Sequence, residues 1–232
     1  MRGQCNSPEQ GNAMEDKRFW QRFAKLYGPI MAKSSARLYR DICDRIRPEL
    51  NREMNVLELA CGTGQLSFPL SGRVRLWEAT DFSEAMIAEA KKKNTSRHLY
   101  FSVQDATTLP YATESFDAVV ISNALHIMPH PEKALSEIWR VLKPEGVLFA
   151  PTFVHGESRG FRLRVKLMEL AGFRTYHKWN GEEFASFVSG HGFRILHREP
   201  LGGSLAPLCY LAAKKNAGAK RTLLRRGAGM GI

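Results

Sequence analysis

The sequence predicts a single doubly wound α/β domain, in which parallel strands alternate with helices. From residue 55 onward, short apolar runs alternate with stretches of helical periodicity, a pattern typical of parallel βα units with helices on both faces of a sheet. The chain has 232 residues, of which 44% are hydrophobic and 25% are charged, and this composition is enough to bury one substantial core. No second domain is required.

The expected elements follow from these apolar runs and from the capping residues between them. Ser83 and Asn180 carry side chains that accept hydrogen bonds at helix N-termini, so each is expected to begin a helix. Strands are expected at residues 55–60, 74–80, 99–104, 116–122, 146–152, 193–199 and 205–213. Helices are expected at residues 65–70, 83–93, 131–142 and 181–190.

The segment before this block, residues 17–47, is predicted to form one or two helices that break at Gly28-Pro29. Its apolar face consists of Phe19, Trp20, Phe23, Leu26, Tyr27 and Ile30. This face either packs on the domain or forms a lid over a cleft, and both can hold at once. The predicted boundaries are a disordered segment at 1–16, the domain at 17–213 and a disordered tail at 214–232.

The formal net charge of +11 is unevenly distributed along the chain. Six cations and no acidic residue lie in the predicted tail: Lys214, Lys215, Lys220, Arg221, Arg225 and Arg226. Such a tail has too few apolar residues to fold alone. It is either a solubilising extension or a segment that steers the protein to nucleic acid, such as RNA, or to an anionic membrane surface.

The cysteines and the apolar runs exclude several classes of protein. The four cysteines are far apart without paired spacing, so neither a disulfide framework nor a thiolate zinc site is indicated. His126 and His130 have helical ligand spacing but no evident acidic partner, and no metal is predicted. No apolar run approaches the roughly 20 residues that cross a bilayer. Residues 1–17 lack the apolar run of a secretory signal, which predicts a cytoplasmic protein.

Residues 56–64 are the segment that says most about a binding site. A buried strand leads to Gly62 and Gly64 and then to a helix, an arrangement that lets a ligand approach bare backbone at the carboxyl end of a parallel strand. A tight βα connection explains the same turn without a ligand. The G-x-G-x-x-G pattern of dinucleotide sites is absent because Ser67 occupies its third position, which argues against a pyrophosphate ligand.

Acidic residues end the next two strands. Asp81 lies about 20 residues beyond the glycine turn, where nucleoside-binding folds place a carboxylate on the ribose hydroxyls. The alternative is an exposed Asp that caps the helix at Ser83. Asp105 follows the third strand at the same edge of the sheet, where it could accept the exocyclic amine of an adenine. Together with the glycine turn after the first strand, these two acidic strand ends predict a nucleoside site.

Five motifs in ordered succession resemble those of class I S-adenosylmethionine (SAM)-dependent methyltransferases, in particular the subgroup that modifies small molecules, quinones and lipids. The motifs are ELACGTG (58–64), DFSEAM (81–86), QDATTLP (104–110), SFDAVVISNALH (115–126) and LSEIWRVLKPEGVL (135–148). The resemblance covers about residues 50–152, and it departs at Glu145, where the family usually has glycine. It implies SAM as cofactor and a Rossmann-like seven-stranded sheet flanked by helices, with the last strand antiparallel and an N-terminal helical lid.

The resemblance also implies which residues bind the cofactor. Glu58 is expected near the methionine ammonium, Asp81 at the ribose hydroxyls and Asn123 near the sulfonium. The full expected set is Glu58, Ala60, Gly62, Thr63, Gly64, Asp81, Phe82, Met86, Gln104, Asp105, Ala106 and Asn123.

Methyl transfer from a sulfonium depends mainly on alignment, and a general base adds to it when the acceptor is a hydroxyl or a protonated amine. His126, shortly after the fourth strand, is the leading candidate base, and packing of the loop at 123–131 is the alternative role. His155 is a second candidate. Tyr27 on the lid would cover the sulfonium or orient a substrate, unless it is a core aromatic.

A hydrophobic acceptor site is expected around Trp20, Phe153, Phe161 and Trp179, although core packing explains such residues as well. The sequence therefore predicts a monomeric or homodimeric enzyme that methylates an O, N or C atom of a small, hydrophobic metabolite. The alternatives are an RNA methyltransferase anchored by the tail and a non-catalytic SAM-binding scaffold. Cytosine-C5 methylation is poorly supported, because no cysteine follows the fourth strand before Cys209.

Overall fold

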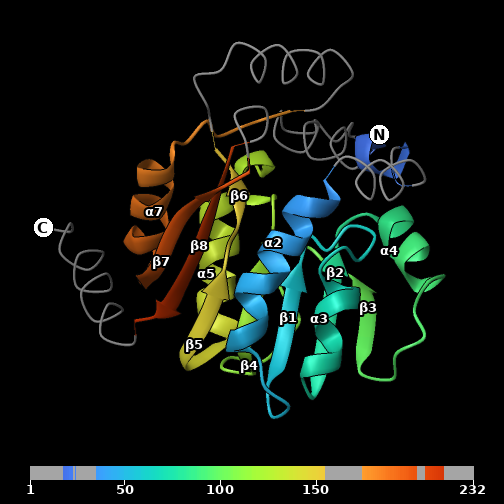
Figure 1. Cartoon of the computed structure of the whole chain (residues 1–232). Helices are drawn as coiled ribbons and strands as arrows, with labels where there is room; N and C mark the ends of the chain where they lie inside the picture. The colour runs from blue at the N-terminus through green and yellow to red at the C-terminus, as the bar shows by residue number, and fades with distance from the viewer. Residues whose placement is uncertain (1–17, 23, 25–34, 155–173, 203–206, 217–232) are drawn as a thin grey trace, which may run out of the picture.

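A computed structural model of the chain describes residues 18–22, 24, 35–154, 174–202 and 207–216. Figure 1 shows a central twisted sheet with helices on both faces. The helices α2, α3 and α4 pack on one face of the sheet, and α5 and α7 pack on the other. This three-layer arrangement confirms the predicted α/β class.

The sheet has the strand order β3-β2-β1-β4-β5-β8-β6, and β7 pairs with β8. The first five of these strands are parallel, whereas β8 is antiparallel to β5, β6 and β7. The strands are β1 (Asn55–Leu59), β2 (Leu76–Asp81), β3 (Leu99–Val103), β4 (Phe116–Ile121), β5 (Leu142–Phe149), β6 (Thr152–Phe153), β7 (Phe193–Leu201) and β8 (Leu208–Lys215). The chain reverses its strand order at β1, so β1 and β4 meet at the switch point where ligands bind in such sheets.

Residues 18–22 and 24 are helical. The further helices in the described residues are α2 (Ala36–Ile46), α3 (Ser67–Leu70), α4 (Glu84–Lys91), α5 (Pro131–Val141) and α7 (Gly181–Gly190), with short 3₁₀ turns η1 (Arg47–Glu49), η2 (Ser71–Arg73) and η3 (Leu125–Ile127). Both predicted caps are confirmed. Ser83 accepts a hydrogen bond from the N–H of Met86, and Asn180 forms a capping box with Glu183. None of these helices is both long enough and apolar enough to span a membrane.

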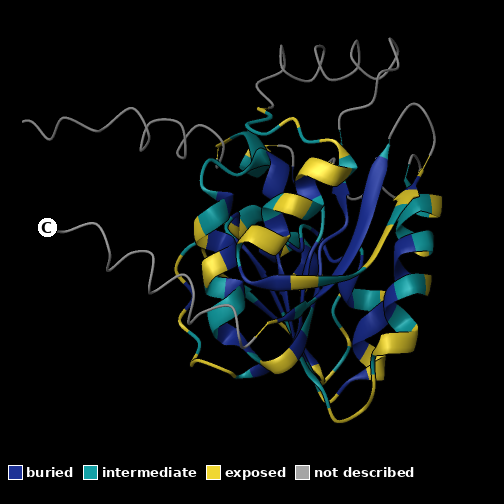
Figure 2. Cartoon of the chain, turned by 90° about the vertical axis from the view of Figure 1, so that its left-hand side faces the viewer, coloured by how far each residue is buried: buried dark blue, intermediate teal, exposed yellow. Residues whose placement is uncertain are grey.

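Alternation along β1 divides its side chains between two hydrophobic layers. Leu57 and Leu59 join the layer beneath α5 and α7, while Val56 joins the layer beneath α2, α3 and α4. Figure 2 shows the strands buried throughout the interior and the exposed residues on the outward faces of the helices. Because both faces of β1 are covered, its carboxyl end is held rigidly at the sheet edge.

The end of the sheet differs from the sequence prediction in two respects. A short eighth strand, β6, follows β5 and pairs with β8. The last strand, β8, continues two residues beyond the predicted strand at 205–213 and ends at Lys215, which is only 2% exposed. The Lys215 ammonium donates to the Leu142 carbonyl at 2.6 Å and to Glu114 at 3.2 Å, and it lies 4.2 Å from the ring centroid of Trp139. Lys214 and Lys215, which were predicted to belong to the tail, therefore lie in the last strand of the sheet.

Glu145 lies within β5 with a φ of 62°, a left-handed conformation that favours glycine. Its carboxylate faces Lys214 at 3.4 Å on the surface, where an ion pair contributes little. Since glutamate replaces the family's glycine, the backbone at this position of β5 is strained.

Glu145→Gly is expected to stabilise the protein by about 0.5–1 kcal/mol, because relief of the left-handed strain exceeds the added entropy of the unfolded chain. Urea denaturation monitored by circular dichroism measures the change. Glu145→Ala, which keeps the strain and removes only the ion pair, should give no stabilisation. Equal stability of the glycine and alanine variants would show that the turn is unstrained.

Candidate active site

A cavity of about 230 Å³ opens at the carboxyl edge of the parallel strands. Its walls come from the ends of β1 to β4, from the start of α4, from the loop after β4 and from the N-terminal segment. The lining residues are Trp20, Ala60, Gly62, Asp81, Phe82, Met86, Gln104, Asp105, Ala106, Thr107, Ser122, Asn123, Ala124, Ile127, Met128, Pro129 and His130. The cavity therefore occupies the position predicted for the nucleoside site.

The turn after β1 forms the floor of this cavity through unusual backbone conformations. Ala60 and Gly62 have φ values of 53° and 57°, and Gly64 has a φ of 88°. A Cβ on Gly64 would lie 2.5 Å from the Phe68 ring, so this position requires glycine for space as well as for conformation. Of the predicted turn residues, Ala60 and Gly62 line the cavity, while Thr63 is buried and accepts from Gln65 at 2.8 Å. Gly64 lies behind the floor and starts the following turn.

Asp81 joins the ends of β1 and β2 and is only 6% exposed. One carboxylate oxygen accepts from the Gly62 N–H at 2.9 Å, and the other accepts from the Ser83 N–H at 2.9 Å. Burial raises the pKa of Asp81 to about 6, against the opposing effect of these two N–H groups. The carboxylate thus links the turn after β1 to the start of α4, and it is buried at the cavity wall and not exposed as the alternative role in capping the helix at Ser83 assumed. Each carboxylate oxygen keeps a lone pair for a further donor.

Glu58 lies behind the cavity wall and not among the lining residues. It is 2% exposed, and its Oε2 accepts from the Ser67 hydroxyl at 2.5 Å and from the Trp77 indole N–H at 2.8 Å. Burial raises the pKa of Glu58 to about 7, while the two hydrogen bonds lower it and nearby Asp81 raises it further. Its predicted contact with the methionine ammonium stays a prediction.

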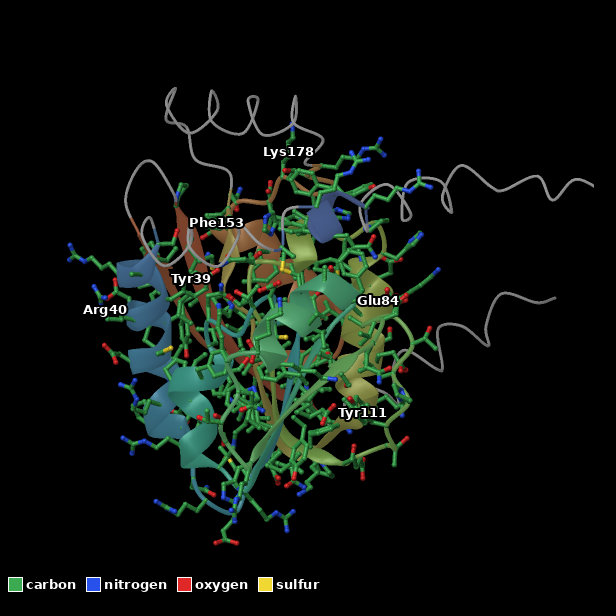
Figure 3. All side chains as sticks on the ribbon, turned by 90° about the vertical axis from the view of Figure 1, so that its right-hand side faces the viewer. Tyr39, Arg40, Glu84, Tyr111, Phe153 and Lys178 are labelled. Atoms are coloured by element: carbon green, nitrogen blue, oxygen red, sulfur yellow. The ribbon has the colours of Figure 1, made fainter. Side chains whose placement is uncertain are left out.

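The end of β3 supplies the third wall. Gln104, Asp105 and Ala106 all line the cavity, together with Phe82 and Met86 from the start of α4. One oxygen of Asp105 accepts from the backbone N–H and the hydroxyl of Thr107, at 2.8 and 2.7 Å, which fixes the carboxylate. Figure 3 looks onto the side of the molecule formed by β3 and α4 and labels Glu84, which follows Ser83 at the start of α4. The apolar side chains of Phe82 and Met86 beside one fixed carboxylate suit a nucleobase.

Two oxygen atoms after β4 are buried without a partner in the described residues: Ser122 Oγ and Asn123 Oδ1. Asn123 has a left-handed φ of 54°, and its N–H donates to the Pro151 carbonyl at 2.8 Å. Buried oxygens without a hydrogen bond are costly, so a donor from water or from a bound ligand is expected at such atoms. Asn123 was predicted from the sequence, but Ser122 was not.

His126 lies in η3 and is not among the cavity-lining residues. Its Nδ1 is 3.0 Å from the Thr152 hydroxyl, and its carbonyl accepts the N–H groups of Tyr176 and His177. These contacts fit the alternative role in packing the loop, and general-base catalysis by His126 stays a prediction. Tyr27 and His155 lie outside the described residues.

The four aromatic residues of the predicted acceptor site do not share one place. Trp20 lines the cavity, whereas Trp179 stacks on His177 and Phe187 beside α7, with ring centroids 4.7 and 4.6 Å away. Phe153 lies in β6 against the His126 ring, and Phe161 lies outside the described residues. The apolar wall is instead completed by residues that sequence reasoning missed: Ala124, Ile127, Met128 and Pro129. His130 also lines the cavity, at the start of α5 and 3.2 Å from Glu132.

Residues 57–150 match a family model described as a methyltransferase domain. A ubiquinone/menaquinone biosynthesis C-methyltransferase, UbiE, of Rickettsia felis is 28% identical over 194 residues, which cover 75% of this chain and 77% of the relative. A demethylmenaquinone methyltransferase of Renibacterium salmoninarum is 41% identical over 107 residues, which cover 46% of this chain and 44% of the relative.

Solved structures share the fold. A SAM-dependent methyltransferase of Thermotoga maritima superposes with a TM-score of 0.65 at 23% identity, and the match covers 86% of this chain and 99% of that one. The fold and the cavity at the switch point agree with the methyltransferase domain that matches residues 57–150. Together with the relatives, they support an enzyme that transfers a methyl group from SAM to a small molecule.

The described residues fit SAM on three counts. The orphaned oxygens of Ser122 and Asn123 suit the ammonium of an amino acid. The buried Asp81 carboxylate suits a ribose diol, and the apolar side chains of Phe82 and Met86 suit an adenine. Neither phosphate nor metal is part of this ligand, in agreement with the absence of the pyrophosphate pattern.

Asp81→Asn is expected to weaken binding of S-adenosylhomocysteine, the demethylated product, more than tenfold, because hydrogen bonds to a charged group contribute about 1.5–3 kcal/mol. Isothermal titration measures the change. Glu84→Gln, an equivalent change on an acid that does not line the cavity, should leave the affinity unaltered. Equal effects of the two variants would show that the Asp81 carboxylate does not contribute to binding.

The affinity of the wild-type protein should also depend on pH. Since the pKa of Asp81 is about 6 and the ionised form accepts the hydroxyls, affinity should fall about tenfold between pH 8 and pH 5. Titrations at several pH values test this. The Asp81→Asn variant should lack the change in affinity that comes from protonation of Asp81. A wild-type affinity that is constant over this range would contradict the role of the ionised carboxylate.

Glu58→Gln should change the pH dependence of folding stability. A carboxyl whose pKa rises from 4.5 in the unfolded chain to about 7 in the folded protein lowers the free energy of unfolding as pH increases through that interval. The glutamine side chain does not titrate, so the variant should lose less stability between pH 5 and pH 8 than the wild type. Denaturation at both pH values tests this, with exposed Glu53→Gln as the control, and parallel curves for wild type and Glu58→Gln would contradict it.

Proposed function

We propose that this enzyme methylates a ring carbon of a small hydrophobic quinol by in-line displacement. The observation that carries the proposal is the composition of the cavity. Most of its polar groups gather at the ends of β1 to β4, while the wall beyond them consists of Trp20, Ile127, Met128 and Pro129, with His130 at its margin. An acceptor against this wall would meet apolar side chains, which favours a hydrophobic ring over a polar metabolite.

The names of the two relatives support the same class of acceptor. One is a quinone C-methyltransferase and the other methylates demethylmenaquinone, and the first match extends over three quarters of this chain. A quinone and its reduced quinol each present a planar, largely apolar ring. The apolar wall of this cavity provides a surface for such a ring.

The residues contribute mainly by positioning. Bound SAM supplies an electrophilic methyl group on a sulfonium sulfur. Asp81 and Asp105 would hold the nucleoside part, and the oxygens of Ser122 and Asn123 would accept hydrogen bonds from the ammonium, which would fix the methyl group in the cavity. The ring carbon would gain the methyl group as the bond from that methyl to sulfur breaks, and its proton would pass to water. Good alignment of this kind can lower the barrier by roughly 7–11 kcal/mol.

Methyl transfer from labelled SAM to reduced demethylated naphthoquinone and to total RNA tests the proposal directly. The quinol should be labelled on carbon, and Asp81→Asn should abolish most of the transfer while Glu84→Gln preserves it. Deletion of residues 217–232 should not change the rate. Labelling of RNA that depends on this deletion would favour the alternative RNA enzyme, and SAM binding without transfer to either acceptor would favour a non-catalytic protein.

A further inference from the structure

The strand β3 ends the sheet and carries the two exposed large hydrophobic side chains of the described residues. Tyr100 is 52% exposed and Val103 is 41% exposed. On its inner side β3 pairs with β2, and no described strand pairs with its outer side. Figure 3 is viewed from this end of the sheet. Natural proteins usually protect such an edge with charges, proline or a bulge, but residues 99–103 contain none of these.

The outward hydrogen-bonding groups of β3 can be assigned from its pairing with β2. The His98 carbonyl accepts from Trp77, and the Gln104 N–H donates to Asp81. Because alternate residues of a parallel strand bond to the same neighbour, the even-numbered residues point inward and Leu99, Phe101 and Val103 point outward. The Leu99 carbonyl accepts from the Asn94 side chain at 2.8 Å. The remaining outward N–H and carbonyl groups have no partner in the described residues.

The geometry points to a second copy of this chain as the occupant of the edge. An antiparallel pair of β3 strands related by a two-fold axis at Phe101 would bring the outward groups of 99, 101 and 103 opposite those of 103, 101 and 99. The free N–H groups of Leu99 and Phe101 would then face the free carbonyls of Val103 and Phe101, and the Val103 N–H would face the Leu99 carbonyl, which also accepts from Asn94. In the same register Val103 would lie beside Leu99 of the second copy, and Tyr100 beside Ser102.

The charges outside the strand are complementary in this register. Arg97 precedes β3 and Asp105 follows it, and both are exposed. The two-fold axis would place Arg97 of each copy opposite Asp105 of the other, where opposite charges favour pairing. A polar strand or a nucleic acid would not use the exposed Tyr100 and Val103 in this way, so a self-complementary strand is the occupant favoured by these residues.

Sedimentation velocity of the full chain over a range of micromolar concentrations tests the inference. The wild type should pass from monomer to dimer as its concentration rises. Val103→Pro removes an outward N–H together with the exposed valine side chain, and Tyr100→Lys adds a charge to the edge, so each should weaken the dimer at least tenfold. Ser186→Lys, which adds the same charge to exposed α7 far along the sheet, should leave the dimer intact.

Thermal unfolding of each variant separates loss of the interface from loss of the fold, and Tyr100→Lys serves alone if Val103→Pro unfolds. A wild-type protein that stays monomeric at all concentrations would overturn the inference. So would a dimer that Tyr100→Lys and Ser186→Lys affect equally.

Discussion

The Asp81 carboxylate is the interaction on which the site depends, because it links the turn after β1 to the start of α4 at the carboxyl end of β2. It accepts the N–H of Gly62 from the turn after β1 and the N–H of Ser83 at the start of α4. The turn after β1 holds Ala60, Gly62 and Gly64 in left-handed conformations, of which the alanine is strained. A single buried acid thus fixes the floor of the cavity and presents its remaining lone pairs to a ligand.

The surrounding fold makes this arrangement possible. Two hydrophobic layers cover both faces of β1, so the turn rests on a strand that cannot shift. The buried Glu58 supports the same region from below by accepting hydrogen bonds from Ser67 in α3 and Trp77 in β2. Rigidity at the ends of β1 and β2 is what methyl transfer requires, since the chemistry relies on alignment and not on covalent catalysis.

Much of this architecture could be predicted because it depends on local patterns. Apolar runs locate the strands, and Ser83 and Asn180 locate two helix starts. Strand ends in a parallel sheet share one edge, so the placement of Asp81, Asp105 and Asn123 around one cavity also follows from the sequence. The glycine turn adds the requirement for bare backbone, which is visible in the motif itself.

Other features depend on contacts that no local pattern contains. Glu58 belongs to the strongest motif, but the alternation of side chains along β1 directs it toward α3 and away from the cavity. Ser122 adjoins Asn123 at a strand end and could have been included on that ground. The path of residues 127–130 depends on how the loop after β4 packs. Lys214 and Lys215 were assigned to the tail because their sequence is basic, and the contacts of Lys215 with Glu114 and Trp139 exist only in the folded chain.

A crystal structure of the protein with S-adenosylhomocysteine tests the central claim most directly. The account predicts that the ribose hydroxyls lie within hydrogen-bonding distance of Asp81 while its bonds to Gly62 and Ser83 remain, and that the ammonium meets Ser122 and Asn123. A nucleoside bound elsewhere, or an Asp81 carboxylate turned away from the ribose, would contradict it.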